Sequence, residues 1–187
     1  MRIIFLLFFL TSISLSFAQN PKNTNELRDL TKLDLGLQGI GFTFEPRISN
    51  KATMDLSVGS GGGYNVSEER ILYKWNLFHP AFYFSATPKW YYNREKRIQA
   101  GKNSEYNSGN YIGLRLKFVT GAFGLIDYNR NSLLINAHWG LQRAIGDRLT
   151  INAHAGAGYA QDVDAKYGTI YPSVDFKFSY ILSRPKI

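Results

Sequence analysis

Two of the three histidines have a spacing that could support metal or proton chemistry. His138 and His154 each fall on the polar side of a segment in which polar and apolar residues alternate. A short turn at Ile145-Gly146-Asp147 predicts that they pair directly across it, with Cβ atoms about 5 Å apart. Two facing imidazoles could hold a metal ion or a proton. No third ligand is visible beyond three acidic residues remote in the sequence: Glu45, Asp55 and Asp175. We therefore interpret the pair as interior packing and expect no metal or other cofactor.

Other reactive patterns are weak. Gly59-Ser60-Gly61-Gly62-Gly63 resembles a phosphate-binding loop in composition alone, because neither Gly-Lys-Ser/Thr nor a helix follows it. A steric role is the better interpretation, in which interior glycines leave room for large neighbours such as Tyr83. A nucleophile elbow does not occur, and we expect no catalytic residues and no enzyme. The only residues that could form a catalytic site at the rim of the fold are Asp127, Tyr128, Asp162 and Asp164. Exposed turns account for their presence there.

The composition limits the elements that could position these residues. A chain of 187 residues allows one domain of ordinary size. The absence of cysteine excludes a disulfide scaffold, a thiolate metal site and a cysteine nucleophile. A mean hydropathy of -0.22 argues against a bundle of membrane helices. Aromatic residues make up 15% of the chain, which also has 17 glycines, a mixture that favours strands and tight turns.

The N-terminus has the pattern of a secretory signal peptide. One basic residue precedes an apolar run from Ile3 to Leu10, and Ala18 is the preferred last residue before cleavage. A membrane anchor is the alternative, but the stretch is shorter than the ~20 apolar residues that a spanning helix needs. We expect a signal peptide over 1–18, a flexible lead-in over 19–32 and the folded domain over 33–187.

The mature chain keeps a basic excess. Removal of Arg2 lowers the formal net charge from +8 to +7. Many of the bases cluster between Lys89 and Lys102, with no stacked-aromatic motif of a nucleic-acid site around them. We therefore expect a solvated loop there and no nucleic-acid partner.

Period-two alternation dominates the chain from Leu33 onward, as in β-strands with two different faces. The phase reverses near Gln38-Gly39, which allows either a bulge in one strand or a hairpin between two. The count is therefore seven or eight strands. The segments that alternate after this point are 40–48, 54–64, 81–92, 111–119, 133–142, 148–159 and 169–182.

The polar face indicates which side of the sheet is inside. It combines small and hydrogen-bonding residues with a few charges of both signs, as expected of a filled interior, whereas the apolar face carries no charge. Trp90 and Tyr92 at one end, with Tyr64 and Tyr159 at the other, resemble the aromatic belts of membrane barrels. We predict an all-β fold, a closed antiparallel up-and-down transmembrane β-barrel of about eight strands. Its predicted interior charges are Glu45, Arg47, Asp55, Lys89, Arg115, Lys117, Asp175 and Lys177.

Several segments together resemble the small outer-membrane β-barrels of the OmpA/OmpX type, and in particular uncharacterised barrels of Bacteroidetes-like Gram-negative bacteria. They are Asn93-Arg94-Glu95-Lys96-Arg97, Asn107-Ser108-Gly109-Asn110-Tyr111, His138-Trp139-Gly140-Leu141-Gln142-Arg143, Gly156-Ala157-Gly158-Tyr159-Ala160 and Asp175-Phe176-Lys177-Phe178-Ser179-Tyr180. The resemblance spans nearly all of the mature chain. It implies export, insertion in the outer membrane with the help of periplasmic chaperones and the barrel-assembly machinery, and contact with outer-membrane lipid.

A barrel of about eight strands has a lumen that side chains fill, so we do not expect a general porin. The first hypothesis is a monomeric, non-enzymatic outer-membrane protein with a role in envelope integrity or in surface binding by its loops. One alternative is a membrane-embedded enzyme that acts on lipid or peptide at the outer rim. Another is a narrow small-solute channel lined by Arg115, Lys117 and Lys177.

Overall fold

The computed structural model describes residues 26–76, 78–124, 126–128 and 130–183. The expected signal peptide and the first half of the lead-in, residues 19–25, lie outside the described residues. Within them, no helix has the length and apolar character needed to cross a membrane.

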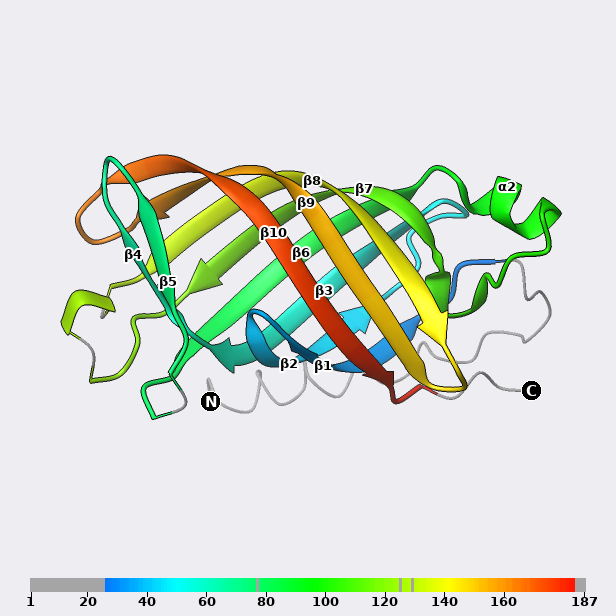
Figure 1. Cartoon of the computed structure of the whole chain (residues 1–187), viewed down its shortest axis with the longest axis horizontal. Coiled ribbons are helices and arrows are strands. Elements are labelled where there is room, and N and C mark those ends of the chain that lie inside the picture. Colours follow the sequence, from blue (N-terminus) through cyan, green and yellow to red (C-terminus); the bar gives the residue numbers. More distant parts are fainter. Residues whose placement is uncertain (1–25, 77, 125, 129, 184–187) are drawn as a thin grey trace, which may run out of the picture.

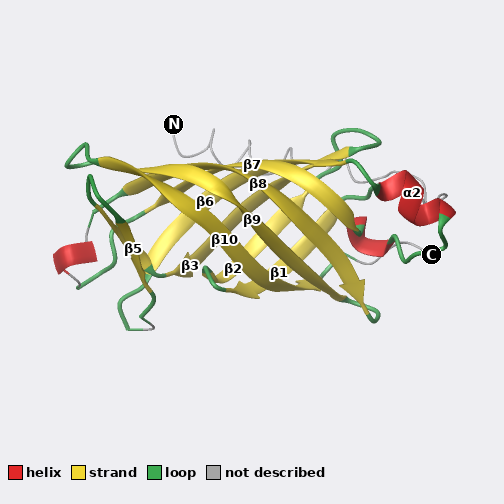
Figure 2. Ribbon diagram, turned by 45° about the horizontal axis from the view of Figure 1, so that its top comes forward, coloured by secondary structure: helices red, strands yellow, loops and turns green. Residues whose placement is uncertain are grey.

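Eight antiparallel strands close into a barrel in the order β1-β10-β9-β8-β7-β6-β3-β2 (Figure 1). The predicted all-β fold, a closed antiparallel up-and-down barrel, and the upper of the two predicted strand counts are therefore confirmed. Figure 2 shows the short helices only outside the strand wall, at its two ends. The barrel strands are β1 (Leu30–Gly36), β2 (Gly39–Glu45), β3 (Ala52–Gly61), β6 (Ala81–Tyr91), β7 (Gly109–Val119), β8 (Ser132–Ile145), β9 (Leu149–Asp162) and β10 (Gly168–Ile181).

A hairpin, not a bulge, explains the change of phase near Gln38. Strands β1 and β2 pair from Leu30↔Glu45 to Gly36↔Gly39. Gly39 has a φ of 109°, a backbone conformation that favours glycine. Strand β1 also starts at Leu30, three residues before the expected Leu33, so the end of the predicted lead-in belongs to the barrel.

The connections divide between the two ends of the barrel. Lys32 pairs with Ile181, so the first and last strands begin and finish at one end, called here the termini end. The turns at 46–51 and 146–148 lie there, with the long segment 92–108, which carries α2 (Arg94–Gln99) and η2 (Glu105–Asn107). The opposite end, called here the hairpin end, carries β4 (Gly63–Val66), β5 (Ile71–Lys74) and η3 (Ile126–Tyr128).

The side chains are arranged with charges inside and large apolar groups outside. Lys32 is 1% exposed and Glu45 0%, although both are charged. On the outer face Leu35 is 59% exposed and Leu114 50%. The alternation along each strand therefore places polar residues in the interior, as predicted, and the polarity is the reverse of a soluble barrel.

Two placements differ from the sequence-based expectation. Tyr64 is only 7% exposed, because the chain leaves the barrel wall at Gly62 and the tyrosine belongs to β4, which turns toward the barrel mouth. Its assignment to an outward aromatic belt was wrong, whereas Trp90, Tyr92 and Tyr159 do face outward. Arg47 is not an interior charge: it follows the end of β2, and its guanidinium pairs with Glu26 at 2.5 Å.

Candidate functional site

A network of buried ion pairs fills the half of the interior nearest the termini end. Lys32 Nζ lies 2.7 Å from Glu45 Oε2, and Lys89 Nζ lies 2.6 Å from Asp55 Oδ2. Lys32 also lies 3.6 Å from Asp55, and Lys89 lies 3.8 Å from Glu45. The four charges thus alternate in sign around one level of the lumen, and each neutralises its neighbours.

Neutral side chains complete this network. Glu45 accepts hydrogen bonds from the Thr53 hydroxyl at 2.9 Å, the Tyr91 hydroxyl at 3.0 Å and the Gln142 amide at 3.2 Å. A carboxylate with this many donors is held in one position. The arrangement fills this part of the lumen, and most of its polar atoms are paired with one another.

Sequence analysis missed two members of the interior charge set, Lys32 and Asp34. Lys177 Nζ lies 2.6 Å from Asp34 Oδ2 across the junction of β1 and β10. Both missed residues alternate with Leu33 and Leu35, so the pattern that could have found them was present. Lys32 was overlooked because the lead-in was extended through residue 32, and Asp34 because the polar side of the short segment 33–37 was not assigned to the interior.

His138 and His154 face each other, but not as directly opposed residues. The observed register pairs His138 with Gly156 and Gly140 with His154, two residues from the predicted pairing. The reason is that the turn consists of residues 146–148, with Gly146 at a φ of 57°, so β8 continues through Ile145.

The two imidazoles stack, with ring centroids 4.0 Å apart and an interplanar angle of 26°. His138 Nδ1 is 2.8 Å from the side-chain oxygen of Asn136. Stacking turns the ring faces, not the nitrogen lone pairs, toward each other. No group of three or more potential His, Asp or Glu ligands occurs in the described part of the chain. The geometry favours packing over metal binding for this pair.

Interior glycines make room for Tyr83, as predicted. A Cβ atom built on Gly41 would overlap the Tyr83 hydroxyl, and one built on Gly59 would lie 2.5 Å from the Tyr83 ring. The same relation holds between Gly113 and His138. Glycine on one strand thus fits a large ring from another, which allows a narrow barrel to close around bulky side chains.

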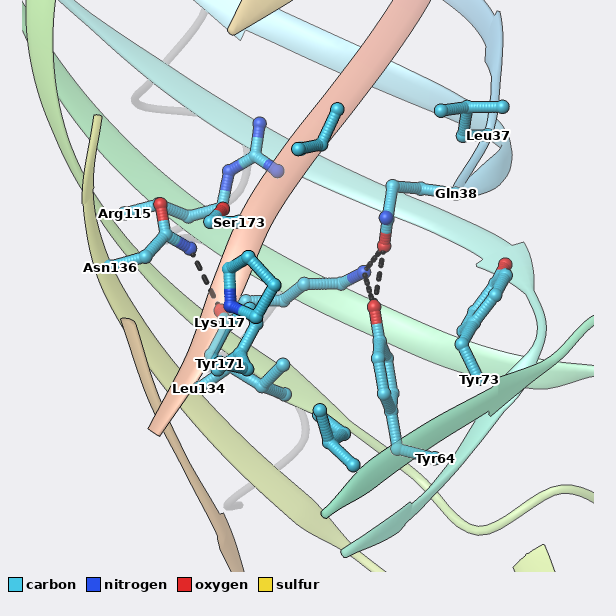
Figure 3. Close-up of a pocket in the computed structure, with 13 residues that line it drawn as sticks. Leu37, Gln38, Tyr64, Tyr73, Arg115, Lys117, Leu134, Asn136, Tyr171 and Ser173 are labelled. Carbon is cyan, nitrogen blue, oxygen red and sulfur yellow. Dashed lines mark hydrogen bonds between the residues drawn. The ribbon is translucent and has the colours of Figure 1, made fainter. Parts of the chain in front are cut away.

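A cavity of about 330 Å³ opens near the hairpin end (Figure 3). Arg115 and Lys117 of β7 reach it from the barrel wall, whereas Tyr64 and Tyr73 reach it from the β4–β5 hairpin. Tyr64 donates a hydrogen bond to Gln38 at 2.8 Å. Burial raises the pKa of the Tyr64 hydroxyl, which therefore remains protonated and keeps this donor role.

The three cations proposed as a channel lining differ in their partners. Arg115 pairs with Asp175 at 3.0 Å, and Lys177 pairs with Asp34. Lys117 instead donates to the side-chain oxygen of Gln38 and lies 3.5 Å from the Tyr64 hydroxyl, so both of these partners are neutral. Arg115 and Lys117, but not Lys177, line the cavity at the hairpin end.

The acidic residues considered for an outer-rim site shape loops. Asp162 accepts hydrogen bonds from the backbone N–H groups of Asp164 and Ala165 at 2.9 and 2.8 Å. Asp164 accepts one from the backbone N–H of Asn131 at 3.0 Å. The structure brings these two aspartates together, whereas Asp127 is exposed on η3. Their contacts are those of structural turn residues.

The chain matches no protein-family model, and neither the curated proteins nor the solved structures give a match. The closed barrel is compatible with a small barrel protein.

Proposed function

We propose that the protein is an outer-membrane β-barrel of a Gram-negative envelope, of the small OmpA/OmpX-like kind, exported by a signal peptide. The observation that carries the proposal is the reversed polarity of the barrel. Its interior buries charges such as Lys32 and Glu45, while its outer face exposes leucine, isoleucine, valine and phenylalanine. Water would penalise such a surface, whereas hydrocarbon stabilises it. A closed barrel also leaves few backbone groups unpaired, as lipid requires.

The distribution of exposed aromatic residues supports the same proposal. Near the termini end, Tyr92 accepts a hydrogen bond from the Trp139 indole at 2.6 Å, and Trp90 lies 6.4 Å from the Tyr92 ring. Near the hairpin end, Tyr159 and Tyr167 are each 45% exposed. Amphipathic aromatic rings collect at both water interfaces of membrane barrels.

The plugged interior supports a non-enzymatic role in envelope integrity or in surface contacts made by loops. Its partners would be outer-membrane lipid and, during biogenesis, periplasmic chaperones and the barrel-assembly machinery. We propose a monomer, because the eight barrel strands close into a ring within one chain. The hairpin end, with two of the three longest connections between barrel strands, 62–80 and 120–131, would face outward.

The two alternatives have less support. For an outer-rim enzyme, Asp162 and Asp164 are engaged with loop backbone, and Asp127 lies apart from them on η3. For a channel, most interior cations are paired with carboxylates. A small, anion-leaning conductance in planar bilayers would favour the channel over the plugged barrel.

Heat-modifiable migration tests the membrane proposal. The protein should fractionate with outer membranes and, after detergent extraction, migrate differently on gels before and after boiling, because a closed barrel resists the detergent until it is heated. A soluble periplasmic protein is the matched reference for the fractionation. Recovery in the soluble periplasmic fraction with identical migration before and after boiling would contradict the proposal.

A further inference from the structure

The barrel wall is incomplete beside the first hairpin. Strand β10 pairs with β9 over its whole length, from Gly168↔Gln161 to Tyr180↔Leu149, but pairs with β1 only from Gly36↔Lys177 to Lys32↔Ile181. The last backbone contact on the β1 side is from the Leu37 N–H to the Phe176 carbonyl, at 3.0 Å. The rest of β10 therefore has an open edge, and it contains Pro172, a residue suited to an edge because it lacks an N–H donor.

The cavity near the hairpin end lies at this opening. It is lined on one side by Pro172, Ser173 and Val174 of β10, and on the other by the turn residues Leu37 and Gln38 (Figure 3). It therefore connects the interior with the outer face of the barrel. Leu37 is 56% exposed and Val174 63%, and both continue the apolar outer surface.

Lys117, which lines this cavity, differs electrostatically from the other interior lysines. It is 5% exposed, yet among the described residues no carboxylate oxygen lies within 4.0 Å of its Nζ. Lys32, Lys89 and Lys177 each have two such partners. The neighbouring Arg115 also has a buried Nε without a hydrogen-bond partner in the structure. A buried cation without a directly paired carboxylate is costly, so a bound anion would gain most here.

We propose that this lateral pocket binds an anionic amphiphile, with a carboxylate or phosphate head at Lys117 and a hydrocarbon tail that leaves between Leu37 and Val174. Lys117 would exchange its hydrogen bond to the neutral Gln38 amide for a charge-assisted hydrogen bond to the head. The tyrosines of the hairpin would cover the head, and the apolar rim would pass the tail to the outer face. The direction of the tail rests on the proposed function, because it requires that outer face to contact lipid.

Calorimetric titration of the full barrel in zwitterionic lipid nanodiscs tests this inference, with empty nanodiscs titrated in parallel. Octanoate and octyl phosphate should each bind saturably at one site, and octanol should not. The relative affinities of the two anions distinguish a carboxylate from a phosphate source. Octanol binding as tightly as the anions, or the absence of any signal above empty nanodiscs, would overturn the proposal.

Three variants locate the site. Lys117→Gln should weaken octanoate binding by about tenfold or more, since a charged hydrogen-bond partner is lost. Lys74→Gln removes the same charge from the exposed hairpin strand β5 and should leave the affinity within about twofold. Equal losses of affinity in the two variants would show that binding depends on net charge alone and would overturn the assignment of the site to Lys117.

Gln38→Glu keeps the inference testable if Lys117→Gln does not fold. It places a carboxylate next to Lys117, where the amide oxygen of Gln38 now lies, and should displace the external anion while preserving the barrel. Undiminished binding in this variant would contradict the proposal. Heat-modifiable migration of every sample separates the two proposals, since a barrel that is folded in lipid but does not bind refutes only the pocket.

Discussion

At the scale of single residues, Glu45 has the largest number of interior contacts described above. Two lysines, a threonine, a tyrosine and a glutamine surround its carboxylate, and no part of the residue is exposed. Removal of the Glu45 charge would leave Asp55 as the one remaining carboxylate partner described for both lysines, so the buried set would carry an excess positive charge. The charge of Glu45 therefore matters to stability more than its volume.

Glu45→Gln should destabilise the barrel by about 3 kcal/mol, because Lys32 and Lys89 lose a shared partner in a site without water access. The measurement is the free energy of unfolding in urea from lipid vesicles, followed by tryptophan fluorescence. Glu95→Gln is the control, since Glu95 pairs with Lys51 in an exposed position and should change stability by less than about 1 kcal/mol. Equal effects of the two variants would contradict a role for burial.

The glycines facing Tyr83 allow a paired test of steric fit. Gly41→Ala should destabilise by about 1–3 kcal/mol through overlap with the Tyr83 hydroxyl. Tyr83→Phe should restore most of that loss, because the nearest remaining atoms, the Val58 carbonyl oxygen and the Tyr83 ring, would be 3.1 and 3.3 Å from the new methyl group. Gly59→Ala should not be restored, since its methyl group also overlaps the Ile40 carbonyl. A double-mutant cycle of thermal unfolding measures both couplings, and equal rescue would refute this geometry.

Sequence alternation was sufficient to place most interior residues but not to pair them. Glu45, Asp55 and Lys89 were assigned to the interior correctly. Their contacts depend on register across several strands, which alternation repeats every two residues and so leaves ambiguous. The histidine pair shows the limit, because a turn that begins at Gly146 shifted its register by two positions without changing the face.

At the scale of elements, the β4–β5 hairpin is the part that the sequence pattern missed. The predicted strand 54–64 was continuous, whereas the structure interrupts it at Gly62 between β3 and β4. Glycine fits either face of a strand, so the run Gly61-Gly62-Gly63 carries no alternation to show the break. The hairpin then packs into the mouth of the barrel: Tyr64 and Val66 join an apolar cluster with Val119, Leu134 and Ala160.

Val66→Asp should release the hairpin from the mouth while the barrel stays closed, because the carboxylate would be buried in this cluster. The measurement is limited proteolysis of the loop at 67–70 in vesicles, which should accelerate at least about fivefold while the heat-modified gel shift persists. Leu72→Asp is the control on the same hairpin, since Leu72 is 40% exposed. In this variant the loop at 67–70 should be cleaved at the wild-type rate. Similar cleavage of the two variants would show that this packing does not hold the hairpin.

At the scale of the whole molecule, reversed polarity predicts that an added charge has different effects on the outer face of the barrel wall and on the hairpin outside it. Leu114 lies in the middle of β7 with 50% exposure, next to the interior residues Gly113 and Arg115. The sequence predicted this outward position from period two alone, because no pairing information is needed to assign a face.

Leu114→Arg should destabilise the barrel in vesicles by about 2–4 kcal/mol, the cost of a charge at the midplane of a membrane barrel. Leu72→Arg on the hairpin should change stability by less than about 1 kcal/mol, since an exposed charge outside the barrel wall remains in water. Urea unfolding from vesicles provides both values. A neutral or stabilising effect of Leu114→Arg would indicate that water, not hydrocarbon, covers this face.

The short junction between β1 and β10 has a consequence for the order of assembly. It joins residues as far apart in sequence as Thr31 and Ser183 with only five residue pairs, whereas β9 and β10 share thirteen. Contacts of such long sequence separation form late, after the local hairpins have reduced the entropy that closure must overcome. We therefore expect this junction to form last during biogenesis and to separate first when the barrel is pulled apart. The Lys177–Asp34 ion pair would stabilise the closed junction.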